Sequence, residues 1–186
     1  MRVFLRKPKW LAYLLLLVIM VQVLPPVFRY YLGSRGWAVY SSSKYGFTVD
    51  YPGNWGVESY PGWFRGREGV VAIIGDSPGI VTAKTTLTIY WRSSIQPSLV
   101  SAADWGYAVT TDEGGYDFSP LEQIAVGPAS NHALQQNLRY GENEIGLSVY
   151  TISGNAEYVL VFRSPDRNDK ATKLFEHMLL SFNLES

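Results

Sequence analysis

The chain of 186 residues contains no cysteine, and this absence removes several classes of chemistry. Disulfides, thiolate zinc sites, cysteine nucleophiles, iron–sulfur clusters and a lipid on an N-terminal cysteine all require a thiol. Histidine is also scarce, because only His132 and His177 are present, and no His-Glu-x-x-His motif joins them. The sequence therefore argues against a structural or catalytic zinc site.

Charged residues make up only 17% of the chain, against 47% hydrophobic residues, and this composition excludes a disordered tail. No acidic residue precedes Asp50, whereas five bases lie within the first 29 residues: Arg2, Arg6, Lys7, Lys9 and Arg29. From residue 30 onward, 11 bases face 16 acids, which gives a net charge of −5. Because phosphate contacts need a clustered basic surface, nucleic acid is not expected as a partner.

Residues 10–28 form a run of 19 uncharged residues, in which Gln22 is the strongly polar one. As a helix the run would be roughly 28 Å long, close to the ~30 Å thickness of the hydrocarbon core of a bilayer. Trp10, Tyr13 and Phe28 lie toward its ends, where aromatic rings suit the membrane interfaces. We therefore predict a single-pass transmembrane signal anchor over residues 10–28.

A cleaved signal peptide is the alternative interpretation of this run. Its cleavage site would need small residues, but residues 25–28 are Pro-Pro-Val-Phe, so the uncleaved anchor is favoured. Four bases precede Trp10 and a sparser set follows the run, which predicts a cytoplasmic N-terminus. Residues 1–9 are then a basic cytoplasmic head and residues 29–36 a linker. Residues 37–186 form an extracytoplasmic domain on the periplasmic, lumenal or cell-surface side.

Alternating apolar and polar residues predict strands along this domain. Residues 45–51 alternate strictly, residues 85–91 are rich in β-branched and aromatic side chains, and residues 70–74 are continuously apolar, which is typical of a central strand. Further strands are predicted at residues 134–140, 145–151 and 158–162. Gly154-Asn155 separates the last two strands and indicates a hairpin.

Two helices are predicted, one within and one after this set of strands. The first begins at Ser98, and its apolar face consists of Leu99, Ala102, Ala103, Trp105 and Val109. The second has a full amphipathic stripe, made of Ala171, Leu174, Phe175, Met178, Leu179 and Phe182. Antiparallel strands with two such helices predict an α+β layered domain.

Both ends of this domain resemble the PsbP-like family. Residues 45–55, YGFTVDYPGNW, are similar to the family's opening, in which Gly-Phe is followed by Tyr-Pro and Trp. Residues 175–182, FEHMLLSF, are similar to its closing helix, which ends in Ser-Phe. The resemblance spans about residues 37–184 and implies an α-β-α sandwich around an antiparallel sheet.

The resemblance also implies a function without catalysis. The best-known members of the family are extrinsic lumenal subunits of photosystem II, non-enzymatic proteins that help retain calcium and chloride at the oxygen-evolving centre. Cyanobacterial members commonly carry a lipid on a cysteine, whereas this chain has a predicted membrane helix instead. The resemblance therefore implies an extracytoplasmic accessory domain rather than a true oxygen-evolving subunit.

The segment at residues 60–67, YPGWFRGR, has the most unusual local composition of the chain. Aromatic and arginine side chains are enriched at binding hot spots, and here they lie among glycines and a proline. Trp63, Phe64, Arg65 and Arg67 are therefore the predicted partner-binding residues. The alternative is a hairpin connection whose aromatic rings fold back over the sheet.

Acidic residues cluster around Gly114-Gly115, where Asp112, Glu113 and Asp117 would supply oxygen ligands to a calcium ion. Their spacing differs from that of an EF-hand loop, so a solvated acidic loop is the favoured interpretation and a calcium site is the alternative. No cofactor is predicted apart from this alternative.

No enzyme is predicted. Gly75-Asp76-Ser77 resembles the nucleophile block of GDSL-type hydrolases, but that class also needs an aspartate three residues before a histidine. Ala129 and Leu174 occupy those positions, so a turn that leaves the preceding strand is the better explanation.

The leading hypothesis is a non-catalytic, membrane-anchored accessory or stabilising subunit of a membrane protein complex, of the photosynthetic or respiratory electron-transfer kind. Its partners are then the membrane and other subunits of that complex. The kind of complex rests on the family resemblance and not on residue chemistry. The rival hypothesis is a free-standing extracytoplasmic domain that binds a ligand, a lipid or an envelope component.

Reporter fusions after Ser186 test the predicted topology. We expect a reporter that functions only outside the cytoplasm to be active there. Replacing the four bases before Trp10 with acids should impair that orientation, because the Lys and Arg bias sets it. Activity of a cytoplasm-only reporter at the same position would overturn the predicted topology.

Overall fold

The computed structural model describes residues 36–64, 67–77, 83–111, 116–140, 144–165 and 169–185. The predicted anchor over residues 10–28, the head before it and nearly all of the linker after it lie outside these residues, so the anchor stays a prediction. Neither helix in the described part of the chain is long and apolar enough to cross a membrane.

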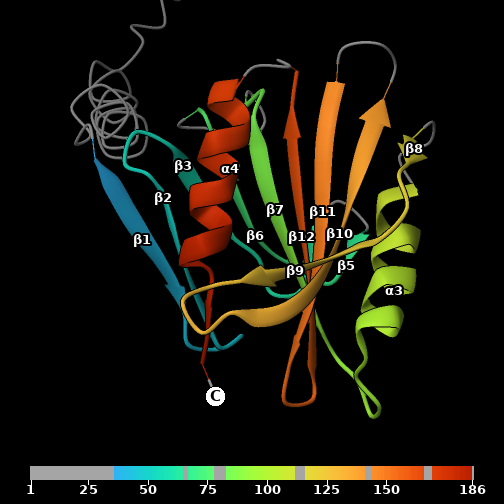
Figure 1. Ribbon diagram of the computed structural model, residues 1–186. Helices are drawn as coiled ribbons and strands as arrows, with labels where there is room; N and C mark the ends of the chain where they lie inside the picture. The colour runs from blue at the N-terminus through green and yellow to red at the C-terminus, as the bar shows by residue number, and fades with distance from the viewer. Residues whose placement is uncertain are drawn as a thin grey trace, which may run out of the picture.

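An eight-stranded antiparallel sheet forms the middle of the domain (Figure 1). From one edge to the other its strands are β3 (Gly56–Ser59), β6 (Val70–Gly75), β7 (Thr86–Ser93), β12 (Ala156–Ser164), β11 (Glu144–Ser153), β10 (Asn131–Tyr140) and β8 (Tyr116–Phe118), and β9 (Glu122–Val126) also pairs with β10. The strands predicted at residues 70–74, 85–91, 134–140, 145–151 and 158–162 are all confirmed. The predicted hairpin is confirmed as well, with Gly154 at a φ of 56°.

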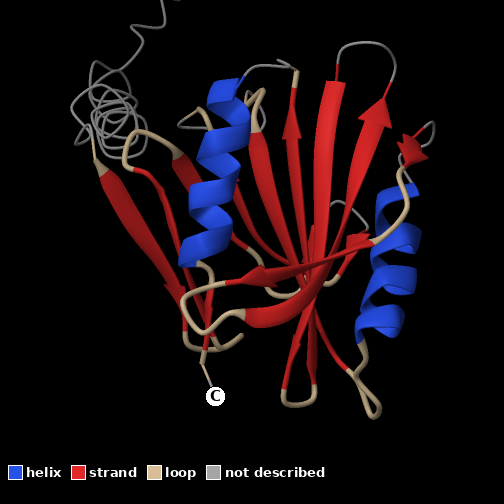
Figure 2. Ribbon diagram, in the orientation of Figure 1, coloured by secondary structure: helices blue, strands red, loops and turns tan. Residues whose placement is uncertain are grey.

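The two faces of this sheet are covered by different helices (Figure 2). Side chains of β12 alternate between the faces: Leu160 and Phe162 belong to the core cluster that includes α4 (Asp169–Ser181). Val159 and Val161 belong to the cluster that includes α3 (Leu99–Thr111). Because both faces are covered, nearly the whole of β12 is buried. The predicted α+β layered arrangement is therefore confirmed.

A second, three-stranded sheet packs beside α4 on the same side of the main sheet. The sequence did not predict it as a separate layer. Its order is β1 (Trp37–Ser42), β2 (Phe47–Pro52) and β13 (Asn183–Leu184). The strand predicted from residue 45 begins instead at Phe47, because residues 43–46 form a turn in which Gly46 has a φ of 64°. Phe47 and Val49 of β2 are fully buried in the α4 cluster.

The closing helix buries the predicted apolar stripe. Its buried side chains are Phe175, Met178, Leu179 and, one residue beyond the helix, Phe182. The ring of Phe175 is stacked on that of Phe162 with centroids 4.6 Å apart, and the ring of Phe182 lies 5.4 Å from that of Phe47. The two segments that carry the family resemblance therefore meet in one core.

Helix α3 buries most of the predicted face, since Ala102 and Ala103 are buried and Trp105 and Val109 pack against the same core cluster. Its fully buried residues are Ala102, Ala103, Gly106 and Thr110, whereas Leu99 is only half-buried. A Cβ on Gly106 would lie 2.2 Å from Cε1 of Tyr150, so the helix crosses a large ring at a distance that only glycine allows. The hydroxyl of Thr110 donates to the Gly106 carbonyl at 2.7 Å, which satisfies this buried polar group.

Truncating Phe182 tests the packing of the two family segments. Phe182→Ala should lower the free energy of unfolding by about 3–5 kcal/mol, because it removes a fully buried ring. Leu180→Ala is the matched control: Leu180 is 67% exposed on the same turn of chain, so its change should stay within about 0.5 kcal/mol. Denaturant melts of the full chain in mild detergent would measure both values, and equal effects would contradict this packing.

Candidate functional site

Three of the four predicted partner-binding residues lie on a short hairpin of β4 (Trp63–Phe64) and β5 (Arg67–Glu68), in which Trp63 pairs with Glu68. Trp63 is 62% exposed. Phe64 is half-buried, with its ring 4.2 Å from that of Tyr60, and it packs against the core cluster of α3. Arg65 lies outside the described residues. One ring of the predicted site therefore faces solvent while its neighbour packs on the sheet, and the binding role stays a prediction.

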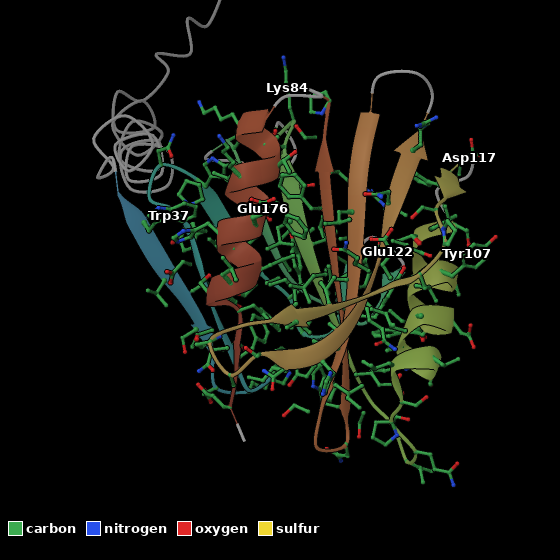
Figure 3. The ribbon with its side chains drawn as sticks, viewed as in Figure 1. Trp37, Lys84, Tyr107, Asp117, Glu122 and Glu176 are labelled. Atoms are coloured by element: carbon green, nitrogen blue, oxygen red, sulfur yellow. The ribbon has the colours of Figure 1, made fainter. Side chains whose placement is uncertain are left out.

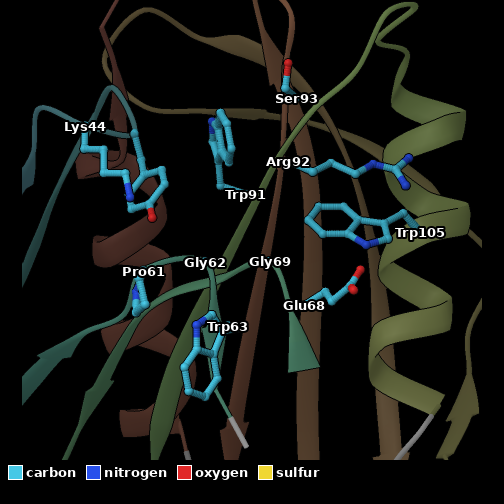
Figure 4. Close-up of a pocket in the computed structure, with 11 residues that line it drawn as sticks. Lys44, Pro61, Gly62, Trp63, Glu68, Gly69, Trp91, Arg92, Ser93 and Trp105 are labelled. Carbon is cyan, nitrogen blue, oxygen red and sulfur yellow. The ribbon is translucent and has the colours of Figure 1, made fainter. Parts of the chain in front are cut away.

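Trp63 lines an open cleft of about 770 Å³ (Figure 4). This size lies within the ~300–1,000 Å³ range of ligand sites in proteins. The walls come from the β1–β2 turn, the β4–β5 hairpin, the end of β7 and α3. The side chains that give the cleft its character are Lys44, Trp63, Glu68, Trp91, Arg92 and Trp105.

Two glycines allow the hairpin to lie tightly against the sheet. Gly62 and Gly69 have φ values of 104° and 85°, which side chains rarely permit. The amide of Trp91 donates to the Gly69 carbonyl at 2.8 Å. A Cβ on Gly69 would lie 2.6 Å from Cζ2 of Trp105. The hairpin is thus bonded to β7, and Trp105 of α3 closes over its backbone.

An ion pair between Arg92, which lines the cleft, and a buried carboxylate lies at this wall. The carboxylate of Glu157 is fully buried, and its Oε2 accepts a hydrogen bond from Nε of Arg92 at 2.7 Å and forms an ion pair with Nη2 at 2.6 Å. Nη2 also donates to the hydroxyl of Ser101 at 3.0 Å, and the amide of Ser98 donates to Oε1 of Glu157 at 3.4 Å. The guanidinium of Arg92 lies over the Trp105 ring at 4.6 Å. One carboxylate therefore joins β12, β7 and the start of α3.

Two opposed effects act on the pKa of Glu157. Burial alone would raise the pKa of this carboxyl, because it removes the charged form from water. The hydrogen bonds from Arg92 and Ser101, together with the charge of Arg92, outweigh burial and hold the pKa of Glu157 below its ordinary value. The group is therefore ionised at neutral pH, and its pairing stabilises the folded state there.

Trp91 is fixed from the core side of the cleft. Its ring lies 5.3 Å from that of Tyr45, and it is hydrogen-bonded to the hydroxyl of Tyr158. That hydroxyl in turn donates to the carbonyl of Tyr45 at 2.7 Å. Burial raises the pKa of Tyr158 above its ordinary value, against the hydrogen bond from Trp91, so the hydroxyl keeps its proton. Trp91 is consequently held in one orientation.

The predicted calcium ligands do not appear as a group in the described residues. Asp112 and Glu113 lie outside those residues, and Asp117 is exposed on β8 (Figure 3). Across the described ranges, no three side chains of the metal-binding types come together to hold an ion. Calcium binding therefore stays a prediction.

The residues considered for catalysis lie in separate parts of the fold. His132 is exposed on β10, whereas His177 lies on α4 with its ring stacked on Trp37 at 3.7 Å. Asp76 follows β6, and its carboxylate accepts a hydrogen bond from the amide of Lys84 at 2.8 Å. This bond matches the turn that the sequence predicted after residue 74.

The sequence predicted Trp63 of the hairpin as a binding residue, but it did not predict the other walls of the cleft. Trp91 and Trp105 were assigned to packing faces of a strand and a helix, where they do pack against the two core clusters. Arg92 and Glu157 are 65 positions apart in the chain, and no local pattern joins them. Their register follows only from the pairing of β7 with β12, in which they lie directly opposite each other.

Comparisons with known proteins support the fold. No family model and no curated protein sequence matches the chain. The solution structure of cyanobacterial PsbP from Synechocystis sp. PCC 6803 is similar, with a TM-score of 0.59 and 18% identity over 82% of this chain and 95% of that chain. A crystal structure from Bacteroides thetaiotaomicron has a TM-score of 0.43 and 11% identity over 82% of this chain and 49% of that chain. A protein of unknown function from Pseudomonas aeruginosa has a TM-score of 0.38 and 11% identity over 77% of this chain and 96% of that chain.

The likeness to cyanobacterial PsbP shows a PsbP-like fold and confirms the resemblance that the two end segments carry. At 18% identity this likeness shows the fold alone. A fold does not by itself determine a function.

Replacing Glu157 tests the buried pair through its pH dependence. Glu157→Gln should lower the free energy of unfolding by about 1–3 kcal/mol at pH 7, because the guanidinium of Arg92 loses its charged acceptor. A carboxyl with a lowered folded-state pKa stabilises the protein above its unfolded pKa, and this stabilisation is lost as pH falls through the folded-state value. The difference between wild type and variant should accordingly shrink below about pH 4.5. Thermal melts from pH 3 to pH 8, an interval set by the pKa values of carboxyl groups, would measure it, and a difference independent of pH would contradict the assignment.

Proposed function

We propose that this chain is a non-catalytic accessory subunit of a membrane protein complex, anchored by residues 10–28 and docked on its partner through the cleft and the β4–β5 hairpin. The complex is of the photosynthetic or respiratory electron-transfer kind, and the support for that part is the PsbP-like fold. The observation that carries docking is the exposed Trp63 beside a cleft of fixed aromatic rings.

The composition of this surface supports a contact site. Trp and Arg dominate the energetics of protein interfaces, and their truncation often costs about 2 kcal/mol or more each. In a monomeric domain a ring as large as Trp63 is ordinarily packed, whereas here 62% of it is exposed. The neighbouring rings of Trp91 and Trp105 are already fixed, so a partner would meet a surface that needs little rearrangement.

The position of the cleft supports a partner outside the membrane. Figure 1 shows β1 running from the end of the domain where Trp37 lies to the opposite end, where the turn with Lys44 follows. Six strand residues span about 20 Å. In the anchored protein the chain enters at the first end, so the cleft would face away from the bilayer.

A free-standing ligand-binding domain is the second candidate, because the volume of the cleft suits a small molecule. Purification of the full chain from its host in mild detergent, followed by mass spectrometry, separates the two. A stoichiometric complex supports the accessory subunit, whereas a lone monomer supports the ligand-binding domain.

Double replacement of Trp63 and Arg65 by Ala tests the contact site. The variant should lose complex retention, while its melting temperature stays close to wild type because surface changes cost within about 0.5 kcal/mol. Leu180→Ala, at an exposed position on α4, is the control and should retain the partner. A lower melting temperature of the double variant, with retention that follows only the folded fraction, would mean that the hairpin rings cover the core and do not bind.

A further inference from the structure

The charges that line the cleft balance one another. Lys44 is a cation and Glu68 a carboxylate, and the charge of Arg92 is compensated by Glu157. An anionic ligand would meet Glu68. A cationic ligand would find Lys44 over the Tyr45 ring at 4.7 Å and Arg92 over the Trp105 ring at 4.6 Å, so those cation–π positions are already taken. The lining therefore favours an uncharged ligand.

The polar groups of the cleft are mainly hydrogen-bond donors. Four donor groups of the cleft bond to no other described residue: the indole N–H groups of Trp63 and Trp105, the ammonium of Lys44 and Nη1 of Arg92. The side-chain acceptors include the carboxylate of Glu68 and the hydroxyl of Ser93. The hydroxyl of Ser93 accepts a hydrogen bond from Nδ2 of Asn155 at 3.4 Å. A matching ligand is consequently rich in acceptors and poor in donors.

The walls of the cleft are flat rings. Figure 4 shows the rings of Trp63 and Trp91 one below the other along the cleft, with Pro61 to one side and Glu68 to the other. Flat, apolar faces with indole donors at their edges suit a ligand that has compact apolar rings and outward carbonyl groups. A polyproline II helix has both features: its prolines lack N–H groups, and its carbonyls make no internal hydrogen bonds.

We propose that the cleft recognises an uncharged, proline-rich segment of the partner in the polyproline II conformation. This inference rests on the proposed docking function and names the chemistry of the docked segment. The prolyl rings stack on Trp63 and Trp91, and the indole N–H groups of Trp63 and Trp105 donate to carbonyls of the segment. Because the segment is already extended when free, its ordering costs little entropy, which is how aromatic grooves bind proline-rich ligands.

The test follows the NMR signals of the indole N–H groups of the full chain in detergent micelles. The probe is a ten-residue polyproline peptide. Titration should shift the indole N–H signals of Trp63 and Trp105, each assigned with a Trp→Phe variant. The signal of Trp37, whose ring is stacked on His177, should not move. A Gly-Ser peptide of the same length should leave all indole signals unchanged.

Variants connect the shifts to the cleft. Trp63→Ala should weaken polyproline binding about 30-fold, the fold-change of a 2 kcal/mol hot spot. Leu180→Ala should bind as wild type does, and circular dichroism should show that both variants keep the fold. An unchanged spectrum with polyproline at millimolar concentration would overturn the proposal. Shifts of the same indoles by a chitin hexasaccharide but not by polyproline would also overturn it, and would assign the cleft to a glycan.

The proposed proline-rich chemistry and the proposed docking function can fail separately. If the Trp63 and Arg65 double variant loses its partner but polyproline does not bind, the docking surface stands and the proline-rich chemistry is wrong. If polyproline binds as predicted but no stoichiometric complex is isolated, the recognition chemistry is supported and the accessory-subunit function fails.

Discussion

The buried carboxylate of Glu157 is the constraint on which the cleft depends. A fully buried anion is stable only with a counter-charge and with donors to its oxygens. These come from Arg92, directly opposite on β7, and from Ser98 and Ser101 at the start of α3. Satisfying this one group therefore fixes where α3 begins relative to the sheet. Trp105, about two turns further along the helix, is then placed against Gly69 and under the guanidinium of Arg92.

The cleft lies at the end of β7 and is lined from both faces of the sheet. Trp105 and the hairpin line it from the α3 face, and Trp91 and the β1–β2 turn line it from the α4 face. Helix α3 packs on β10, β11 and β12, whereas β4 packs on β6, so the end of β7 lies at the seam. On the opposite face, α4 and β2 fill the space with large rings such as Phe47 and Phe175. The α3 face is built in the reverse way, because the helix supplies small residues and the sheet supplies rings such as Tyr150. Because α3 lies so close to the sheet, it covers only part of that face, and the β4–β5 hairpin covers the part beside it.

Prediction from sequence succeeded where patterns are long and failed where they are short. Strands β7, β10, β11 and β12 and the stripe of α4 carry patterns over several residues, so the sequence identifies them, and the continuous apolar run identifies β6. Strands β4, β5 and β13 have two residues each, which is too few for any period. Helix α3 buries Gly106 and Thr110 instead of Leu99, because close approach to Tyr150 outweighs hydrophobicity there.

The same distinction applies to the candidate site. Composition alone identified the segment at residues 60–67, because Trp and Arg among turn formers stand out locally. The remaining walls depend on register: Arg92 meets Glu157 only after β7 pairs with β12, and Trp105 meets Gly69 only after α3 is fixed. Both Trp91 and Trp105 also pack on the core, so their residue type and pattern do not separate a structural from a binding role.

The cleft combines two fixed rings with one exposed ring, and the magnitudes say what each contributes. Truncating a hot-spot Trp costs about 2 kcal/mol or more, and this value already includes the cost of about 0.5–1.5 kcal/mol for immobilising its side chain on binding. The net gain is positive but modest, so this ring adds affinity without making binding irreversible. Trp91 and Trp105 pay no such cost, because Tyr158 and Gly69 already hold them. In the proposed site, their fixed spacing would determine which ligand shape is accepted, while Trp63 would determine how tightly it is retained.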